Sequence, residues 1–500
     1  MKQPVTRGSI LLATILGLMP LPRMTAQSLT VLHRFSARPE GTNQDGADPA
    51  GQLVTDPVGK RLYGTANQGG AYGVGTVFSL GIDGSDFVAL HSFEFSTGFM
   101  PFGGVVLSDN ILFGTTSQGG ASGNGSVFAL HLDGSGFETL HTFPPTVGNP
   151  PFATNRDGAQ SSSGLVAAGN RLYGTAVFGG SGGNGTVFAL NTDGTGFTVL
   201  HSFRAGGQAF FGGNYTNIGG IRPNGGLVLS GNTLYGTAGG GGNFARGTVF
   251  RVNTDGTGFA TLHNFRSTPF DPVNDPGGLN NEGASPKGGL ALSGDTLFGT
   301  TLSGGIGGES GLGTVFALRT DGTQFRTLHR FTSSSGAYRP QTELVVSGDT
   351  LYGTTEGAGG TLFSLRTDGT GFLRLHTLRL DVDGNGPGSP VLLGTQLYAV
   401  AASGGPVDEG SPGGSGTGTV FRLSFAPPLT IQLSGTGSVL SWPTHFGEFD
   451  YSGYTLEGNP DPGVPTAWST VLSTPSIANG RYTVPIPFGD DRRFFRLKSP

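Results

Sequence analysis

The chain has 500 residues, of which 93 are Gly and none is Cys, and its formal net charge is only -5. Charged residues make up 12% of the sequence, which is about half of the usual share. No Lys/Arg-rich run or basic helix stands out, so the composition argues against nucleic acid as a partner. Without Cys, no disulfide can stabilise the protein in an oxidising compartment, and packing must do so.

The first 26 residues predict a secretory signal peptide. Lys2 and Arg7 form its charged start, residues 10–18 its apolar stretch, and Thr25-Ala26 a small-residue cleavage site. The apolar stretch is far shorter than the roughly 20 residues of a membrane-spanning helix, and no second run of that length follows. We therefore expect a secreted or cell-surface protein that has no membrane span once the signal is removed.

Three short sequence words recur seven times each, in a fixed order. Because internal repeats decide the architecture, they have to be interpreted first. LYGT-like words begin at residues 62, 112, 172, 234, 297, 351 and 397; GTVF-like words begin at 75, 125, 185, 247, 313, 360 and 418; LHxF-like words begin at 32, 90, 140, 200, 262, 328 and 375.

Each repeat predicts four short β-strands. In the unit at 226–265 they are 226–230, 233–237, 247–252 and 259–265, rich in β-branched and aromatic residues and separated by Gly, Asn and Asp. An Asp-Gly turn joins the third and fourth strands in six units. We expect the Gly of LYGT to leave room for an aromatic ring. The strands are apolar on both faces and no helical periodicity is present, which is typical of propeller blades.

The order of the words predicts how the propeller closes. Leu29–Phe35 is a fourth-strand word with no unit before it, and Gly418–Leu423 is a third-strand word with no fourth strand after it. Pairing of these two segments would complete a seventh blade and remove open sheet edges. We therefore predict an all-β fold in which residues 27–426 form a seven-bladed β-propeller closed by the N-terminal strand.

The words LYGT, GG-x-x-G-x-G-T-V-F and D-G-x-G-F-x-x-L-H-x-F resemble the GloVer (Gloeo/Verruco) tandem repeat over residues 29 to 424. The resemblance implies a secreted "choice-of-anchor" protein and supplies no catalytic residues. The sequence departs from the family pattern at Leu397-Tyr-Ala-Val400, and residues 494–500 are no surface-sorting tail. Free secretion is therefore favoured over anchoring.

Pro427-Pro428 marks the start of a second domain at 427–500, where the repeat is lost. Six short apolar segments separated by Gly, Pro and Asn predict a small β-sandwich. Leu440-Ser-Trp442 and Tyr454-Thr-Leu456 are similar to the second and third strands of a fibronectin type III or immunoglobulin-like module. That resemblance implies a spacer or adhesion module.

Loop length places the candidate binding residues on one face. The LYGT word begins 19 to 32 residues after the end of the preceding LHxF word, and the loop from LYGT to GTVF also varies in length, whereas the other two turns hardly vary. Variable loops on a rigid scaffold are the usual place for function. Aromatic rings beside polar groups in the longest loops suit glycan binding, although the rings would also pack the loops locally. The candidate residues are Phe152, Arg156, Asp157, Phe210, Phe211, Tyr215, Phe270, Asp271, Asp275 and Glu282.

Two further patterns suggest metal or acid–base chemistry. One His occurs in each LHxF word, and because a sevenfold rotation would keep these residues apart, we interpret them as structural. Asp381-Val-Asp-Gly-Asn-Gly386 resembles the first half of a calcium loop with ligands Asp381, Asp383 and Asn385. Leu392 stands where the bidentate Glu belongs, so an ordinary turn is the stronger interpretation and no cofactor is required.

Together these patterns predict a monomeric, non-catalytic scaffold that binds a polysaccharide or a surface protein. A propeller-type glycan hydrolase or lyase is the first alternative, and a purely structural surface protein is the second. A pair of carboxylates in a central cleft would favour the enzyme, and an aromatic surface would favour binding.

Overall fold

A computed structural model describes residues 28–149, 153–205, 209–210, 214–266, 280–305, 311–405, 416–425, 429–434, 437–446, 449–460, 468–471, 474–487 and 494–498. These residues form strands joined by turns, with short 3-10 turns at Pro39–Gly41, Ser333–Ser335 and Gly357–Gly359. The all-β expectation is therefore confirmed for this part of the chain. None of the described residues belongs to a helix that is long and apolar enough to cross a membrane.

Six antiparallel sheets each contain four strands in chain order, and we number them sheets 1 to 6. Their strands follow the four segments that the repeat predicts. The sheets are β2 (Ala47–Thr55), β3 (Arg61–Gln68), β4 (Thr76–Gly81), β5 (Val88–Ser92); β6 (Val105–Ser108), β7 (Ile111–Thr116), β8 (Ser126–His131), β9 (Glu138–Thr142); β10 (Val166–Ala168), β11 (Arg171–Ala176), β12 (Thr186–Asn191), β13 (Thr198–Ser202); β17 (Val228–Ser230), β18 (Thr233–Ala238), β20 (Thr248–Asn253), β21 (Ala260–Asn264); β22 (Ala291–Ser293), β23 (Thr296–Thr301), β24 (Thr314–Arg319), β25 (Arg326–Arg330); and β26 (Val345–Ser347), β27 (Thr350–Thr355), β28 (Thr361–Arg366), β29 (Leu373–Thr377).

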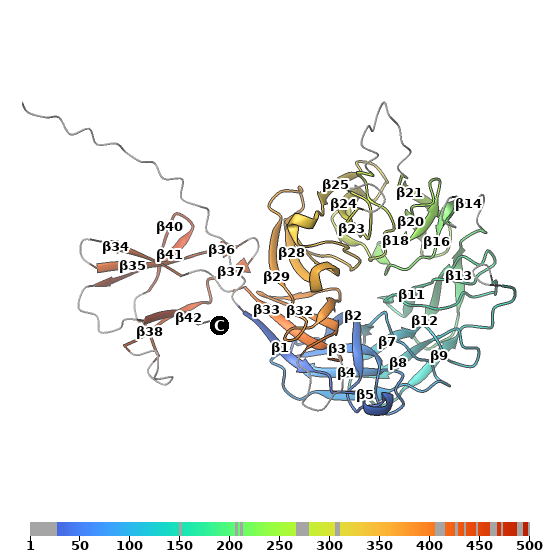
Figure 1. Ribbon diagram of the computed structural model, residues 1–500, viewed down its shortest axis with the longest axis horizontal. Helices are drawn as coiled ribbons and strands as arrows, with labels where there is room; N and C mark the ends of the chain where they lie inside the picture. The colour runs from blue at the N-terminus through green and yellow to red at the C-terminus, as the bar shows by residue number, and fades with distance from the viewer. Residues whose placement is uncertain are drawn as a thin grey trace, which may run out of the picture.

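A further sheet, sheet 7, combines strands from both ends of the repeat region. β32 (Gln396–Ser403) pairs with β33 (Thr419–Ser424) and also with β30 (Asn385–Pro387) and β31 (Val391–Leu393). β1 (Ser28–Arg34) lies antiparallel to β33 and takes the position that the fourth strand holds in the other sheets. Figure 1 shows the blue β1 beside the orange β33. The first described strand thus belongs to the same sheet as the last strand of the repeats.

Seven clusters of buried side chains join neighbouring sheets. One cluster contains Tyr63 and Val77 of sheet 1 together with Leu112 and Phe128 of sheet 2, and the next five join sheets 2 to 7 in turn. The seventh joins sheet 7 back to sheet 1, through residues such as Tyr398. Figure 1 shows the sheets around a common centre. Each of these sheets is therefore covered on both faces, in a propeller-like arrangement.

The repeated glycines are explained by close packing. A Cβ placed on Gly174 of the LYGT word would lie 2.5 Å from Cζ of Phe188, the Phe of the GTVF word. The expectation that this Gly leaves room for an aromatic ring is confirmed. A Cβ on Gly185 of GTVF would lie 2.6 Å from Cδ of Pro223, which belongs to the loop that leads into the first strand of the next sheet (its entry loop). Gly418 of sheet 7 has the same relation to Pro49, which leads into sheet 1.

The last part of the chain forms two sheets and a hairpin. One sheet is β34 (Thr430–Ser434), β35 (Gly437–Pro443), β41 (Arg481–Pro487) and β40 (Ser476–Ala478); the other is β39 (Ser469–Thr470), β38 (Thr455–Asn459) and β42 (Phe494–Lys498); the hairpin is β36 (His445–Phe446) and β37 (Phe449–Asp450). Leu440 and Trp442 of the first sheet share a buried cluster with Leu456 of the second, so the two sheets pack against each other.

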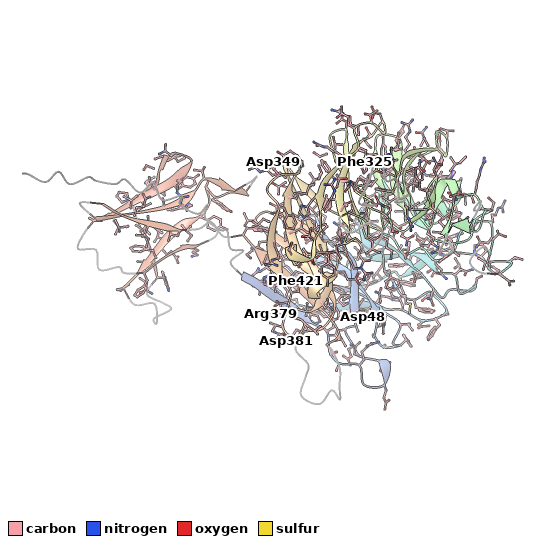
Figure 2. All side chains as sticks on the ribbon, turned by 45° about the horizontal axis from the view of Figure 1, so that its top comes forward. Asp48, Phe325, Asp349, Arg379, Asp381 and Phe421 are labelled. Atoms are coloured by element: carbon pink, nitrogen blue, oxygen red, sulfur yellow. The ribbon has the colours of Figure 1, made fainter. Side chains whose placement is uncertain are left out.

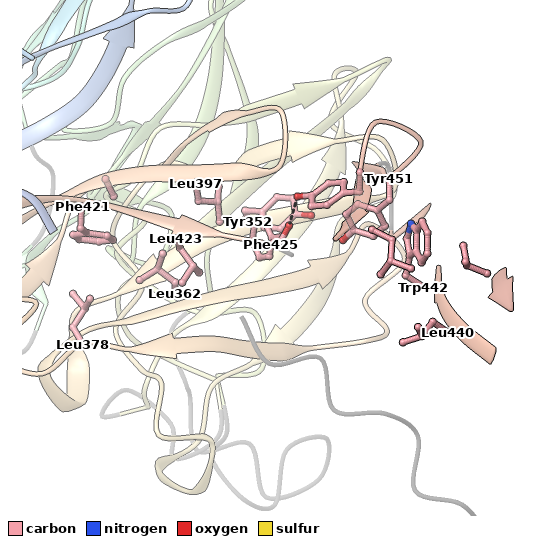
Figure 3. Close-up of a cluster of buried hydrophobic side chains, with 14 of the residues drawn as sticks. Tyr352, Leu362, Leu378, Leu397, Phe421, Leu423, Phe425, Leu440, Trp442 and Tyr451 are labelled. Atoms are coloured by element: carbon pink, nitrogen blue, oxygen red, sulfur yellow. Dashed lines mark hydrogen bonds between the residues drawn. The ribbon is translucent and has the colours of Figure 1, made fainter. Parts of the chain in front are cut away.

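The same cluster connects these two sheets to the repeat region. The rings of Tyr352 in β27 and Phe425, directly after β33, lie 5.8 Å apart. The hydroxyl of Tyr454 donates a hydrogen bond to the carbonyl of Phe425 at 3.4 Å. Figure 3 shows Tyr352, Phe425 and Tyr451 in one row between the repeat region and Trp442. The C-terminal part is therefore in contact with sheets 6 and 7 through aromatic side chains.

We predict that Phe188→Ala lowers the free energy of unfolding by about 3–5 kcal/mol, because it leaves a cavity in a fully buried site between sheets 2 and 3. Urea unfolding followed by circular dichroism measures the change. Phe95→Ala is the matched control, since the Phe95 side chain is 63% exposed and its truncation should change stability far less. Equal losses in the two variants would contradict the packing described above.

Candidate functional site: a polar cavity on the loop face

The loops that enter the first strands lie against the loops between the second and third strands. Ala159 forms an antiparallel bridge with Phe178, and Ala284 forms one with Ser303. The side chain of Asn155 accepts a hydrogen bond from the N–H of Gly180 at 2.9 Å. The entry loops and the loops between the second and third strands therefore lie at the same end of the sheets. This is the end at which β11 finishes.

The entry loops hold a repeated residue in the left-handed conformation. Six non-glycine residues share φ values of 53° to 60°, and five of them lie two positions after a repeated Gly, whereas Arg339 lies three positions after Gly336. Such backbone is strained and persists only where the surroundings enforce it. In Arg222, the N–H donates to the carbonyl of Asn184 in the preceding sheet, and the carbonyl accepts from the N–H of Gly239, both at 3.0 Å. These six residues are Asp48, Met100, Gln160, Arg222, Ser285 and Arg339.

Sequence analysis missed this position, although a signal for it exists. Pro follows the left-handed residue at 49, 101, 223, 286 and 340, and lies four residues before the Leu or Val that leads into the first strand. The N–H of Asp48 donates to the carbonyl of Thr417 at 2.9 Å, so the same contact joins sheet 7 to sheet 1. The left-handed residue followed by Pro therefore marks a backbone hydrogen bond between neighbouring sheets.

A cavity of about 470 Å³ lies among the entry loops of sheets 2 to 5, and we call it the central cavity. Its described side chains comprise two cations, three amides, three hydroxyls and several apolar groups, and no carboxylate is among them. The lining residues are Phe102, Ser117, Gln118, Gln160, Ser162, Val177, Phe178, Ile221, Arg222, Asn224, Gly239, Gly240, Ser285, Lys287 and Leu302. Its volume lies within the range of about 300–1,000 Å³ that is typical of ligand sites.

Two features of the central cavity indicate unused binding capacity. Asn224 Oδ1 is buried and has no hydrogen-bond partner among the described residues, which is uncommon for a buried polar atom. Arg222 and Lys287 are exposed to solvent, and no described carboxylate forms an ion pair with either. The Arg222 guanidinium lies 5.7 Å from the ring centre of Phe178. Hydrogen-bond acceptors, donors and an aromatic ring are thus all available to a ligand.

One buried carboxyl group, that of Glu343, lies near the chain segments that follow Asn224 and Lys287. Glu343 belongs to the entry loop of sheet 6. In that loop Gln341 occupies the position that Lys287 holds in sheet 5, and Glu343 follows Gln341 by two residues. A Cβ placed on Gly289 would lie 2.7 Å from Glu343 Oε2, so this side chain reaches across toward the segment that follows Lys287. Burial raises the pKa of Glu343 to about 7. Nothing in the repeat pattern selects Glu343.

Two of the predicted binding residues are instead partners of the repeated histidines. Asp157 Oδ2 lies 3.2 Å from His141 Nε2, and Glu282 Oε2 lies 3.3 Å from His263 Nε2. The same relation joins Asp45 to His33 at 3.1 Å. All three acids directly precede a Gly in an N-x-[D/E]-G word, which the sequence contains at 43–46, 155–158 and 280–283. Asp157 and Glu282 therefore have a structural explanation outside the central cavity.

Of the other predicted binding residues, only Arg156 has a described side chain, and it is not among the residues that line the central cavity. Arg156 is exposed beside Asp157. The backbone at Phe210 and Tyr215 belongs to a small hairpin of β14 (Ala209–Phe210) and β15 (Asn214–Tyr215), next to the pair β16 (Asn217–Ile221) and β19 (Gly240–Gly242). Phe152, Phe211, Phe270, Asp271 and Asp275 lie outside the described residues.

The candidate calcium ligands are also part of the repeat. Asp381 and Asp383 occupy the first and third positions of the N-x-[D/E]-G pattern, here as D-V-D-G. The Asp383 carboxylate accepts hydrogen bonds from Arg379 and contacts His376 Nε2 at 3.1 Å. Asn385 Oδ1 accepts from the N–H of Gly386 at 2.7 Å. Arg379 and Asp381 lie close together in Figure 2. In the described part of the chain, no three His, Asp or Glu side chains are placed to hold a metal ion.

The repeated histidines form a stacking contact that recurs between neighbouring sheets. His201 stacks on Phe259 of the next sheet at 3.5 Å with an interplanar angle of 2°, and the same contact occurs for the five other such pairs. His91, His201 and His329 have no carboxylate partner of the kind described above, and burial lowers the pKa of each to about 4. These three rings are therefore neutral at pH 7.

This neutrality predicts that stability falls in mild acid. The unfolded chain binds protons near pH 6.5, whereas the folded chain resists until about pH 4, so stability is lost as the pH falls between these values. We expect the Tm to fall over this range. His329→Phe should reduce that fall, because Phe keeps the stack on Phe372 and does not titrate. His131→Phe is the control and should leave the pH dependence unchanged, because His131 is exposed at the end of β8. The same slope in all three proteins would contradict this assignment.

Comparison with known proteins identifies the repeat and adds little to the architecture. No curated protein matches the sequence. Three solved structures with similar architecture are a nidogen/laminin complex (14% identity, 63% of this chain and 93% of that chain, TM-score 0.37), an oligogalacturonate lyase from Vibrio parahaemolyticus (12%, 79% and 97%, 0.45) and RRP9 WD40 repeats (10%, 81% and 99%, 0.46). At these scores the likenesses carry no argument about activity or ligand.

The sequence matches the Gloeobacter/Verrucomicrobia repeat three times in tandem, at residues 21–156, 150–280 and 274–438. The resemblance to the GloVer repeat is therefore confirmed, and these matches cover the LYGT, GTVF and LHxF words together with the entry loops that form the central cavity. The chain belongs to the Gloeobacter/Verrucomicrobia repeat family.

Proposed function

We propose that this protein is a secreted or cell-surface, non-catalytic scaffold that binds a polysaccharide in the central cavity. The observation that carries the proposal is the cavity itself, which combines an unpaired buried acceptor at Asn224 with other polar groups and two Phe rings. Sugar rings pack on aromatic faces while polar groups orient the hydroxyls. This combination fits a sugar unit better than a purely apolar ligand.

We propose that the scaffold is a closed, seven-bladed propeller spanning residues 27–426. The seven sheets and the seven buried clusters between them support this proposal, as does the pairing of β1 with β33. Closure would fix the entry loops rigidly around one centre. A preorganised site of this kind loses less entropy when it binds a ligand.

Secretion is supported by the sequence of residues 1–26, which lie outside the described residues. We propose residues 427–500 as a fibronectin type III or immunoglobulin-like spacer, supported by its two packed sheets. The contact of this spacer with Phe425 would fix the orientation of the loop face relative to the spacer.

A glycan hydrolase is the less favoured alternative. Glycosidases of the common kind use two carboxyl groups separated by about 5–9.5 Å. Among the described residues no carboxylate lines the central cavity, so Glu343, which reaches the segment after Lys287, has no second acid there. A purely structural role would leave the unpaired groups of the cavity without explanation.

A glycan array combined with a reducing-sugar release assay tests the proposal. We expect binding to at least one polysaccharide without release of reducing ends. Asn224→Ala should weaken binding about two- to tenfold, which is the usual worth of one hydrogen bond. Asn170→Ala is the control, because Asn170 lies at the opposite end of β11 from the cavity. Release of sugar would favour the hydrolase, and no binding at all would favour the structural role.

Calcium is not required in this proposal. Burial works against ionisation of Asp383, but hydrogen bonds from Arg379 and His376 hold its pKa below the ordinary value. The carboxylate is thereby already stabilised in its charged form. We expect an unchanged Tm after chelation with EDTA. A lower Tm that calcium restores would show that the loop at 381–386 binds the ion.

A further inference from the structure

We propose that the sugar unit held in the central cavity is anionic and that Arg222 and Lys287 bind its carboxylate or sulfate group. This inference rests on the proposed function, since it names the chemical class of the same ligand. Both side chains line one cavity, and no carboxylate joins them there. The juxtaposition of two cations with sugar-binding groups points to a charged saccharide.

Several exposed cations on the repeats have an acidic partner. Arg319 pairs with Asp295, Arg366 pairs with Asp349 at 3.5 Å, and Arg379 pairs with Asp383 at 3.3 Å. Arg222 and Lys287 have no such partner among the described residues, and both line the same cavity. An external anion bound there would supply the missing negative charge.

Comparison of sheets 4 and 6 shows how the cation at Arg222 is left unpaired. Arg339 occupies the same repeat position and has the same left-handed backbone, with φ of 60° against 56° for Arg222. In sheet 6, Glu356 at the end of the second strand lies 3.8 Å from Arg339 Nε. The corresponding residue in sheet 4 is Gly239. The two residues are equivalent because the N–H of Gly239 donates to the Arg222 carbonyl and the N–H of Glu356 donates to the Arg339 carbonyl. Sheet 4 therefore keeps the arginine and lacks the acid.

The surroundings of the two cations fit a sugar acid in particular. The guanidinium group offers two parallel N–H donors, which match the two oxygens of a carboxylate or sulfate. Asn224 Oδ1 is a buried acceptor that a sugar hydroxyl would satisfy. Phe178 lies beneath the Arg222 guanidinium and Phe102 is 41% exposed in the same cavity. One anionic sugar unit would engage the charge, the acceptor and an aromatic face together.

Matched oligosaccharides test this inference by isothermal titration calorimetry on the full chain. The probes are oligomannuronate, the neutral β-1,4-linked oligomannose of equal length, and its sulfated derivative. We expect the anionic probes to bind at least tenfold more tightly than the neutral one. The stronger of the two anionic probes identifies carboxylate or sulfate as the preferred group. Binding should weaken as the salt concentration rises.

Two variants remove one charge each without changing the repeat. Arg222→Gln introduces the residue that Gln160 already provides at this position, and Lys287→Gln introduces the residue found at Gln341. Each should weaken binding of the anionic probes about tenfold and weaken binding of neutral oligomannose far less, because the neutral probe offers no charge to these side chains. Lys60→Gln is the control, because Lys60 is exposed in the turn between β2 and β3, at the other end of the strands.

The outcomes separate this inference from the proposed function. Equal affinity for neutral and anionic probes, unaffected by Arg222→Gln and Lys287→Gln, would overturn the anionic ligand while glycan binding stands. If the array and all three probes show no binding, the proposed function itself fails. A loss of affinity in Lys60→Gln equal to that in Lys287→Gln would also overturn the inference, since the effect would then be a general one of net charge.

Discussion

Each sheet of the repeat region is stable only between two neighbours, and this requirement governs the rest of the structure. Its strands are apolar on both faces, so burial on one side alone would leave a row of Phe, Leu and Val side chains in water. The repeated residues meet this requirement in several ways. The Phe of GTVF fills the space above the LYGT Gly, the His of LHxF stacks on the next turn, and the left-handed residue joins two backbones.

These contacts explain which parts of the sequence are free to differ between units. A residue that packs between sheets must satisfy the same geometry seven times, so the words remain similar. The entry loops share a Gly, the left-handed residue and, in five of these units, a following Pro, whereas side chains such as those of Arg222 and Lys287 form no ion pair with a described carboxylate. Chemistry that differs from unit to unit is therefore concentrated there, as the contrast between Arg222 and Arg339 shows.

The strands and the close packing were predictable because they depend on local pattern and on repetition. Leu172-Tyr-Gly-Thr predicts a strand, and its Gly predicts a close ring, from the unit alone. The site was not predictable in the same way. Asp157, Glu282 and Asp383 were selected for their charge, yet the repeated Gly after each of them indicates a structural pattern. Arg222, Asn224 and Lys287 come from different units, and only the fold brings them to one cavity.

The ring closure is tested most directly by a cross-link between β1 and β33, which the absence of Cys makes simple to read. Thr30 lies directly opposite Arg422, and opposed residues of antiparallel strands have Cα atoms about 4.5–5.5 Å apart, within the range of a disulfide. The account predicts that Thr30→Cys combined with Arg422→Cys forms an intramolecular disulfide in the folded protein, seen as faster migration on a non-reducing gel, and that it raises the Tm. Failure of the folded double variant to cross-link, or cross-linking only between molecules, would contradict it.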